Sequence, residues 1–236
     1  MFSLIIAIDG PAGTGKGTIS KLIADRMNFT YIDTGAMYRA VTLKMVRNNI
    51  EITELDKIKN MLYDTKIDFE NSHDANGRYN QKVFLDGEDV SKEIRTPEIT
   101  ALTSPYSAEP VIRQKMVEMQ REFGNSKDII MEGRDITTVV FPNADVKIYL
   151  DATPEERANR RYKEYLSKGI ETTYEETLEA INKRDYTDMH KEVGALKIAD
   201  GATVIDTTNL SIEEVYSEVK KCIDEKLKNG GNDGLS

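Results

Sequence analysis

A glycine-rich loop between an apolar run and a helical pattern constrains the fold of this chain more than any other feature. The loop runs from Gly10 to Thr18 and reads Gly-Pro-Ala-Gly-Thr-Gly-Lys-Gly-Thr. Leu4–Ile8 predicts a buried parallel strand before it, and apolar residues at helical spacing over 19–27 predict a helix after it. Glycine lets backbone N–H groups turn toward one point, where the helix N-terminus adds partial positive charge. This arrangement predicts an α/β fold that binds a nucleoside triphosphate.

The loop also supplies the first candidate catalytic residue. Lys16 places a full positive charge where it reaches the β- and γ-phosphates of ATP. The usual pattern has Ser or Thr directly after the lysine, whereas here Gly17 stands between Lys16 and Thr18. This ending resembles the nucleoside monophosphate kinases rather than GTPases or motor ATPases. Thr18 is the candidate hydroxyl beside Mg²⁺, which we expect to be held mainly through nucleotide and water. The expected ATP contacts in the loop are Gly10, Pro11, Ala12, Gly13, Thr14, Gly15, Lys16, Gly17 and Thr18.

Composition narrows the classes of partner. The 236 residues suffice for one large domain or for a core with insertions, and 39% of them are hydrophobic. A net charge of −9 argues against binding of a nucleic acid polymer or an anionic membrane. The single cysteine, Cys222, excludes an internal disulfide and fits a reducing compartment. The apolar run at the N-terminus is too short for a signal peptide, and no stretch approaches the ~20 apolar residues of a membrane span. We therefore expect a cytoplasmic protein.

Short apolar runs recur along the chain and alternate with helical patterns. Beyond the first strand, four runs predict buried strands: Phe29–Ile32, Ile129–Met131, Val146–Leu150 and Thr203–Ile205. Alternating strands and helices predict a central parallel five-stranded sheet, with ligand contacts at the carboxyl ends of its strands. Three helices have capping-box starts, in the pairs Thr153 with Glu156, Thr173 with Glu176, and Ser211 with Glu214; Pro154 occupies a first helical position.

Residues 66–95 break this alternation. Lys66–Glu70 alternates polar and apolar residues, and Lys82–Leu85 is followed by the turn pair Asp86-Gly87. We expect a small antiparallel β insert here, with Asn71–Asn80 as a polar loop. At the C-terminus, Asn229–Ser236 has no apolar periodicity and is expected to be disordered.

Three clusters of polar residues are candidates for an acceptor site. Asp33–Arg39 follows the second predicted strand, Met131–Asp135 ends the third, and Arg184 lies four residues before Asp188 on one helix face, with Lys191 a turn later. Taken singly, these clusters read as a capped turn, a surface ion pair and a helix salt bridge. Because two of them lie at strand ends beside a phosphate loop, together they favour one shared ligand site.

At this point the chain closely resembles the bacterial cytidylate kinases, which phosphorylate CMP and dCMP with ATP. The resemblance covers about residues 4–225. It rests on residues 8–18, 33–39, 85–90 with 93–96, 133–135 with 138–142, and 147–151. The resemblance implies an α/β P-loop fold of three layers, with a β insert in the monophosphate-binding region and a helical lid. It also implies ATP and CMP or dCMP as substrates.

The resemblance assigns roles residue by residue. Thr34, Arg113 and Asp135 match residues that contact the base, with Ser104 nearby; Arg39 and Arg134 match those that hold the acceptor phosphate. Lys191 stands where some members have arginine. The implied CMP contacts are Thr34, Tyr38, Arg39, Ser104, Arg113, Arg134, Asp135, Arg184 and Asp188. Arg157 and Arg160 are the implied ATP contacts on a lid helix that also carries Arg161. The expected catalytic residues are Lys16, Arg134, Arg157 and Arg161.

The resemblance also implies a division of the chain. One P-loop kinase domain, 1–228, has a core of 1–35, 104–152 and 192–228. The monophosphate-binding region with the insert is 36–103, the lid is 153–191, and 229–236 is the disordered tail. We expect a monomer.

Base chemistry is consistent with this reading. Cytosine offers an amino donor and ring acceptors, which a carboxylate and an arginine complement, whereas uracil would set an acceptor against Asp135. Phosphoryl transfer depends on positioning and charge neutralisation, so no general base is assigned. Three alternatives stay open: a kinase that prefers UMP or AMP, a P-loop ATPase that acts as a switch or binding module, and a kinase of a non-nucleotide metabolite.

Overall fold

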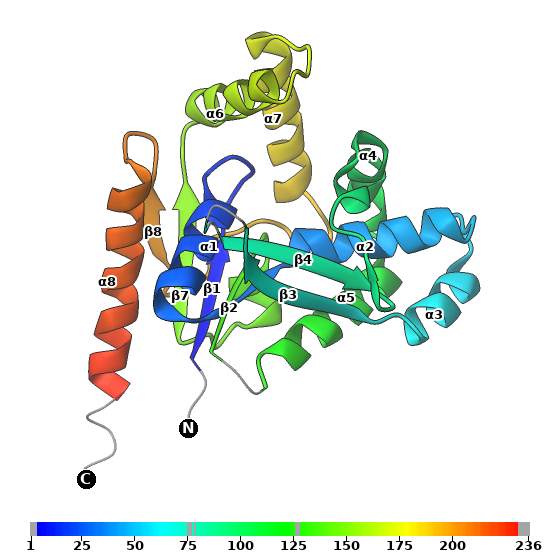
Figure 1. The fold of residues 1–236 in the computed structure, drawn as a ribbon, viewed down its shortest axis with the longest axis horizontal. Coiled ribbons are helices and arrows are strands. Elements are labelled where there is room, and N and C mark those ends of the chain that lie inside the picture. The colour runs from blue at the N-terminus through cyan, green and yellow to red at the C-terminus, as the bar shows by residue number, and fades with distance from the viewer. Residues whose placement is uncertain (1–3, 75–76, 78, 126–127, 231–236) are drawn as a thin grey trace. The chain divides into compact units, whose positions relative to one another are not determined.

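The computed structural model describes residues 4–74, 77, 79–125 and 128–230. Five strands form one sheet in the order β2-β6-β1-β7-β8, and three form a second sheet in the order β3-β4-β5 (Figure 1). In the first sheet, β1 pairs in parallel with β6 and β7, and β7 with β8. All five predicted strands are present, as β1 (Ile5–Asp9), β2 (Thr30–Asp33), β6 (Ile129–Gly133), β7 (Val146–Asp151) and β8 (Thr203–Asp206). The predicted α/β fold is confirmed.

The chain forms two compact units. Unit 1 comprises Met1–Phe29 and Asp128–Ser236, and unit 2 comprises Thr30–Lys127. The structure thus groups 30–35 and 104–127 with unit 2, whereas the predicted division grouped them with the phosphate loop. The functional division into core, monophosphate-binding region and lid stays a prediction.

Unit 1 contains the phosphate loop and most of the parallel strands. The interior positions of β1 and β6, including Ile6, Ile8 and Ile130, are fully buried, as expected for strands covered on both faces. Helix α1 packs against β1, β6 and α8, and α8 packs against β7 and β8. The helices of this unit are α1 (Lys16–Met27), the π-helix η2 (Ile136–Val140), α6 (Pro154–Ser167), α7 (Tyr174–Met189) and α8 (Ile212–Gly230).

Two helices of unit 1 begin with the predicted capping boxes. At α7, Thr173 Oγ1 accepts the Glu176 N–H at 3.1 Å, and Glu176 Oε2 accepts the Thr173 N–H at 2.9 Å. Ser211 and Glu214 exchange the same pair of bonds before α8. The reciprocal bonds fix where these helices start.

Only one of the two hydrogen bonds of the predicted capping box forms at the start of α6. Thr153 Oγ1 accepts the Glu156 N–H at 3.3 Å, and Pro154 takes the first helical position. The Glu156 carboxylate does not return to the Thr153 N–H, because it pairs with Arg160. The Thr153 N–H instead donates to Thr208 Oγ1 at 3.1 Å.

Unit 2 holds the β insert, and its first hairpin is longer than predicted. Strand β3 extends to His73 and β4 starts at Tyr79, with His73 paired to Tyr79. Five residues of the predicted loop 71–80, namely 71–73, 79 and 80, therefore belong to strands, and 75, 76 and 78 lie outside the described residues. Its polar side chains are largely exposed, so no alternating apolar pattern marked it. Asp86 and Gly87 both have positive φ, 51° and 88°, and form the predicted tight turn into β5.

The remaining elements of unit 2 are helical and surround buried apolar residues such as Ile58 and Met116. Helix α2 packs against α3, α4, α5 and η1, and α3 packs against α5. At the C-terminus of the chain, α8 continues to Gly230, two residues into the predicted tail, and 231–236 lie outside the described residues. The elements of unit 2 besides β2 are α2 (Thr34–Arg47), α3 (Leu55–Tyr63), β3 (Ile67–His73), β4 (Tyr79–Leu85), β5 (Glu88–Asp89), η1 (Glu93–Arg95), α4 (Pro97–Tyr106) and α5 (Pro110–Phe123).

Candidate functional site

The backbone of the phosphate loop favours glycine at three positions with positive φ, which are Gly10, Gly13 and Gly15. Gly10 has φ 146°, and a Cβ there would lie 2.0 Å from the carbonyl oxygen of Leu150 in β7. Gly15 has φ 92° and is the N-cap of α1. All three positions disfavour any other residue. Gly17, by contrast, lies inside the helix, so only part of the glycine pattern reflects backbone geometry.

Lys16 is the first buried charge of the site. Its Nζ donates to Pro11 O at 2.7 Å, and Thr14 Oγ1 donates to the same carbonyl at 3.1 Å. Burial, with added repulsion from Arg134 and Arg184, lowers the pKa of Lys16 to about 7. An ammonium held this way against its own loop is stabilised when an anion replaces the carbonyl, as a phosphate group does.

Asp9, at the end of β1, was not predicted as a site residue. It is fully buried, and its Oδ1 accepts the Ile136 N–H at 2.9 Å. Its Oδ2 accepts the N–H and the Oγ1–H of Thr137, at 2.7 and 2.6 Å. Burial raises the pKa of Asp9, against the effect of these hydrogen bonds. The carboxylate thus fixes the two residues that follow Asp135. The sequence contained one signal for Asp9: it is a carboxylate at the end of an apolar strand, directly before the phosphate loop.

A cluster of charges joins the end of β6 to α7. Asp188 Oδ2 accepts from Arg134 Nε at 2.9 Å, and Asp188 Oδ1 pairs with Lys191 Nζ at 2.9 Å. Arg184 Nε lies farther from Asp188 Oδ2, at 3.8 Å. Burial favours the neutral acid, but Arg134 and Lys191 outweigh it and hold the pKa of Asp188 below its usual value. The structure therefore brings together Arg134, Arg184 and Asp188, which the sequence placed in one site.

Arg157 lies against the phosphate loop with almost no exposure. Its side chain is 3% exposed, and its Nη2 pairs with Asp185 Oδ2 at 2.6 Å. Its Nε donates to Ala152 O at 2.9 Å and its Nη1 to Ala12 O at 3.2 Å. The structure thus brings this predicted ATP contact to the loop. Asp185, its partner on α7, was not predicted.

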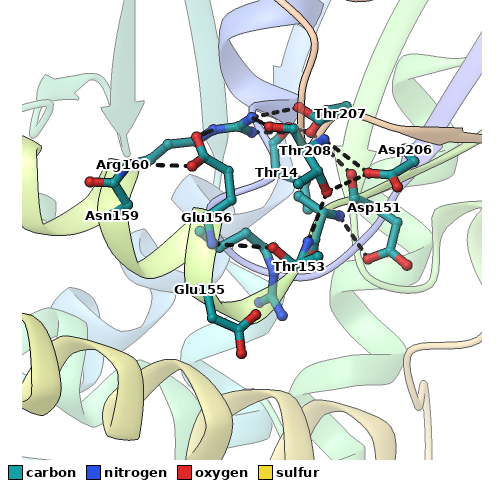
Figure 2. A network of polar contacts seen from close by, with 12 residues as sticks. Thr14, Asp151, Thr153, Glu155, Glu156, Asn159, Arg160, Asp206, Thr207 and Thr208 are labelled. Atoms are coloured by element: carbon teal, nitrogen blue, oxygen red, sulfur yellow. Dashed lines mark hydrogen bonds and ion pairs between the residues drawn. The ribbon is translucent and has the colours of Figure 1, made fainter.

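Arg160 and Arg161, the other predicted lid arginines, have separate partners. Arg160 Nε pairs with Glu156 Oε1 at 2.9 Å, one turn earlier on the same helix, and its Nη groups contact Thr207 (Figure 2). Arg161 Nη1 pairs with Glu164 Oε2 at 3.3 Å. Its guanidinium also lies 5.1 Å from the ring centre of Tyr165. Of the three arginines, Arg161 is the most exposed.

In unit 2, the start of α2 carries three of the predicted CMP contacts: Thr34, Tyr38 and Arg39. Asp33 caps this helix by accepting the Ala36 N–H at 2.8 Å, and its Oδ2 accepts from Arg39 Nη2 at 3.1 Å. Thr34 is buried at 4% exposure. The predicted capped turn is thus present, and its capping carboxylate also orients Arg39.

Two further predicted contacts lie around the connection between α4 and α5. Arg113 is 5% exposed, and its Nη1 contacts Ser107 O at 3.5 Å. Ser104 O accepts from Ser107 Oγ at 2.9 Å. Asp135, the other predicted base contact, belongs to unit 1, where it is 6% exposed and precedes η2. Its pairing with Arg113 on a base stays a prediction.

The part of the chain that the structure describes includes no group of three or more His, Cys, Asp or Glu side chains arranged to hold a metal ion. Thr18, the predicted magnesium-side hydroxyl, is exposed in the first turn of α1. None of the described helices combines the length and the apolar character needed to cross a membrane.

Comparison with known proteins gives a consistent result. The sequence profile of the family described as cytidylate kinase matches residues 6–225. A protein named cytidylate kinase from Fusobacterium nucleatum is 47% identical, over 97% of this chain and 100% of its own length. Proteins of the same name are 48% identical in Caldicellulosiruptor bescii and 43% identical in Bacillus subtilis. These two matches cover 97% and 95% of this chain, and 99% and 98% of the relatives.

A solved structure supports the fold alone. The crystal structure of an uncharacterized protein from Eubacterium ventriosum aligns with a TM-score of 0.51 at 12% identity. The alignment covers 94% of this chain and 99% of that one.

Proposed function

The chain belongs to the cytidylate kinase family, and we propose that it transfers the γ-phosphoryl group of ATP to CMP and dCMP, giving CDP and dCDP. The observation that carries this proposal is the family match, which spans 6–225 and so includes the phosphate loop and all three clusters of candidate acceptor residues. The geometry of unit 1 supports it, because the buried cations Lys16 and Arg157 lie against the glycine loop and Arg134 follows a strand of the parallel sheet.

On the donor side, the loop backbone and Lys16 hold the β- and γ-phosphates. Transfer builds negative charge on the phosphoryl oxygens, and preorganised cations stabilise it without reorganisation. Lys16 supplies such a cation from a buried position, and Arg157 supplies another from its contact with Ala12 O. Closure of α6 and α7 over the nucleotide would also exclude water and limit ATP hydrolysis.

On the acceptor side, we propose that Arg39 and Arg134 hold the phosphate of CMP. Each guanidinium is oriented by a carboxylate, Asp33 for Arg39 and Asp188 for Arg134. Tyr38, Arg184 and Asp188 take the ribose. A hydroxyl nucleophile needs deprotonation, but an acceptor phosphate is already anionic, so this transfer requires no general base.

We propose that Arg113 and Asp135 select the base, with Thr34 and Ser104 nearby. A carboxylate accepts from the exocyclic amino group of cytosine, and an arginine donates to its ring acceptors. Uracil reverses this pattern. The alternative preference for UMP or AMP is disfavoured by this chemistry and by the names of the relatives.

The residues present fit Mg²⁺ as the companion of ATP. Mg²⁺ takes oxygen ligands, keeps several waters and is commonly bound through substrate phosphates with few protein ligands. Thr18 offers one exposed hydroxyl at the loop, and the described chain has no carboxylate cluster that would hold the metal alone. The metal would neutralise charge on the ATP phosphates, with Thr18 as its candidate protein contact.

We also propose that the enzyme acts in the cytoplasm as a monomer and without a nucleic acid partner. The single cysteine and the net charge of −9 support the first and last of these statements. Light scattering at micromolar concentration tests the monomer directly.

A panel of acceptors tests the function. Purified protein with ATP and Mg²⁺ is given CMP, dCMP, UMP or AMP, and release of ADP is followed with each. We expect kcat/KM for CMP and dCMP to exceed that for UMP and AMP by at least about tenfold, which lies well within what a hydrogen-bonding pocket can provide. ADP release that is equal without any acceptor would instead favour an ATPase switch.

A further inference from the structure

The turn after β8 connects three parts of unit 1 (Figure 2). Thr207 N–H donates to Asp151 O at the end of β7, at 2.8 Å. Thr207 Oγ1 lies 3.2 Å from Thr14 O in the phosphate loop. The Thr207 hydroxyl and carbonyl both accept from Arg160 on α6. A residue of a connecting turn, 1% exposed, thus contacts the loop and the helix that carries the predicted ATP-binding arginines.

Arg160 makes two hydrogen bonds to Thr207. Arg160 Nη1 donates to Thr207 Oγ1 at 3.1 Å, and Arg160 Nη2 donates to Thr207 O at 2.6 Å. The remaining guanidinium nitrogen, Nε, donates to Glu156 Oε1 at 2.9 Å. A planar guanidinium that is held on two sides keeps one orientation.

The chemistry of the hydroxyl links this orientation to the phosphate loop. A threonine hydroxyl has one proton to donate and accepts through its lone pairs. While it accepts from Arg160, its proton goes to Thr14 O or to Asp151 O, which lies 3.0 Å away. Asp151 O already accepts the Thr207 N–H, so the contact that only the hydroxyl makes is the one with Thr14. A cationic donor polarises the hydroxyl and strengthens that second bond.

We infer that Thr207 is a positioning residue for ATP binding, and that it acts by holding Arg160 beside the phosphate loop. This inference rests on the proposed function, which places Arg160 among the ATP contacts. The residue touches no substrate in this account. It lowers the cost of nucleotide binding because the arginine does not need to be ordered when ATP arrives.

The test compares Thr207→Val, which keeps the shape of the side chain, with Thr207→Ser, which keeps the hydroxyl. Thr203→Val is the matched control, because Thr203 lies exposed on β8. KM for ATP and for CMP, kcat, the Kd of ATP by calorimetry and the midpoint of thermal unfolding are measured for each. Thr207→Val should raise KM and Kd for ATP about fivefold, with KM for CMP unchanged within about twofold. Thr207→Ser and Thr203→Val should match the wild type.

Arg160→Ala tests whether Thr207 affects ATP binding by holding Arg160 in place. It should raise the Kd of ATP about as much as Thr207→Val, and the double variant should be no weaker than Arg160→Ala within about twofold. Arg160→Lys, which keeps the charge but cannot contact both Thr207 atoms, should resemble Arg160→Ala. If Thr207→Val lowers the unfolding temperature without raising the Kd of ATP, the inference is wrong. It is also wrong if the two effects multiply in the double variant, or if Arg160→Lys binds ATP normally.

These readouts separate the inference from the function. Calorimetry with ATP needs no acceptor, so the role of Thr207 is measured even if CMP is not the substrate. Conversely, a Thr207→Val protein that phosphorylates CMP with unchanged KM and Kd for ATP would overturn the inference and leave the proposed function intact.

Discussion

Arg134 and Asp188 are separated by 54 positions and form an ion pair, with Nε and Oδ2 2.9 Å apart. The pair joins the end of β6 to α7, and the Asp188 side chain is only 7% exposed. From the sequence, Asp188 was paired with Arg184 on the same helix face. That distance is 3.8 Å, so the tertiary contact is the closer one. Asp188 pairs with Arg134 through one carboxylate oxygen and with Lys191 through the other. It thereby orients the Arg134 guanidinium, which we assign to the acceptor phosphate.

Replacing Asp188 should destabilise the protein in a pH-dependent way. Asp188→Asn leaves Arg134 and Lys191 without their charge partner, so we expect the free energy of unfolding at pH 7 to fall by about 2 kcal/mol. The folded-state pKa of Asp188 lies below the ordinary 3.8. The carboxylate therefore contributes stability above pH 3.8, and this contribution is lost as the pH falls through the folded-state pKa. The difference between wild type and variant should accordingly shrink below about pH 4, as measured by urea unfolding.

Asp224→Asn is the control for that experiment. Asp224 forms an exposed pair with Lys220 on α8, so its loss should change the unfolding free energy by no more than about 0.5 kcal/mol. A wild-type-like stability of Asp188→Asn at pH 7 would show that the buried pair does not stabilise the fold.

Removing the charge of Lys16 should abolish most of the transfer while leaving the fold intact. Its Nζ donates to Pro11 O within its own loop, and burial already disfavours its charge. We expect Lys16→Ala to lower kcat by roughly 10²–10³-fold, the usual effect of losing electrostatic stabilisation of a transferring group. Lys21→Ala, on the same helix, should retain normal turnover. Activity above about a third of wild type in a folded Lys16→Ala protein would refute the assigned role.

The sequence predicted the parallel sheet well because its inner strands β1, β6 and β7 are largely buried on both faces and therefore read as short apolar runs. It predicted the hairpin less well. Exposed polar residues such as Asn71 and His73 belong to strands because their backbones pair with the neighbouring strand. This pairing does not require a pattern of apolar side chains that the sequence would show. The π-helix at 136–140 was also missed, because its geometry depends on the distant carboxylate of Asp9.

Base selection should depend on Asp135. Asp135→Asn replaces an acceptor by an amide that also donates, so CMP turnover should fall and the ratio of kcat/KM between CMP and UMP should narrow. Lys191→Met should instead affect CMP and UMP alike, because Lys191 contacts Asp188 rather than a predicted base residue. An unchanged ratio in Asp135→Asn would remove Asp135 from the base site.

Helix α6 should become more ordered when both substrates bind. Two of its arginines have partners beyond the helix, Arg157 at Asp185 and Arg160 at Thr207, but Arg161 pairs with Glu164 within α6. A polyphosphate would attract both Arg157 and Arg161. We expect hydrogen exchange over about 154–170 to slow when ATP and CMP analogues are added together. Equal exchange with and without ligands, with near-normal activity of Arg157→Ala and Arg161→Ala, would exclude a lid.

The site residues could be predicted where they belong to a short sequence motif. They could not be predicted where their role depends on a contact with a residue that is distant in the sequence. Lys16 and Asp33 lie in a loop and a helix cap that short patterns identify. Asp185 and Thr207 become recognisable only when the chain brings them to Arg157 and Arg160. Their sequence neighbourhood carries no signal of those contacts, since each partner is at least 28 positions away.

Transfer of labelled phosphate tests the central claim most directly. The protein is mixed in excess over ATP labelled at the γ-phosphoryl group, with Mg²⁺ and equal concentrations of CMP, UMP and AMP, and the products of one turnover are separated by chromatography. We predict that the label appears in CDP, ahead of UDP, ADP and inorganic phosphate, and that Lys16→Ala forms little labelled CDP in the same time. Label that appears mainly in inorganic phosphate, or mainly in another diphosphate, would contradict the account.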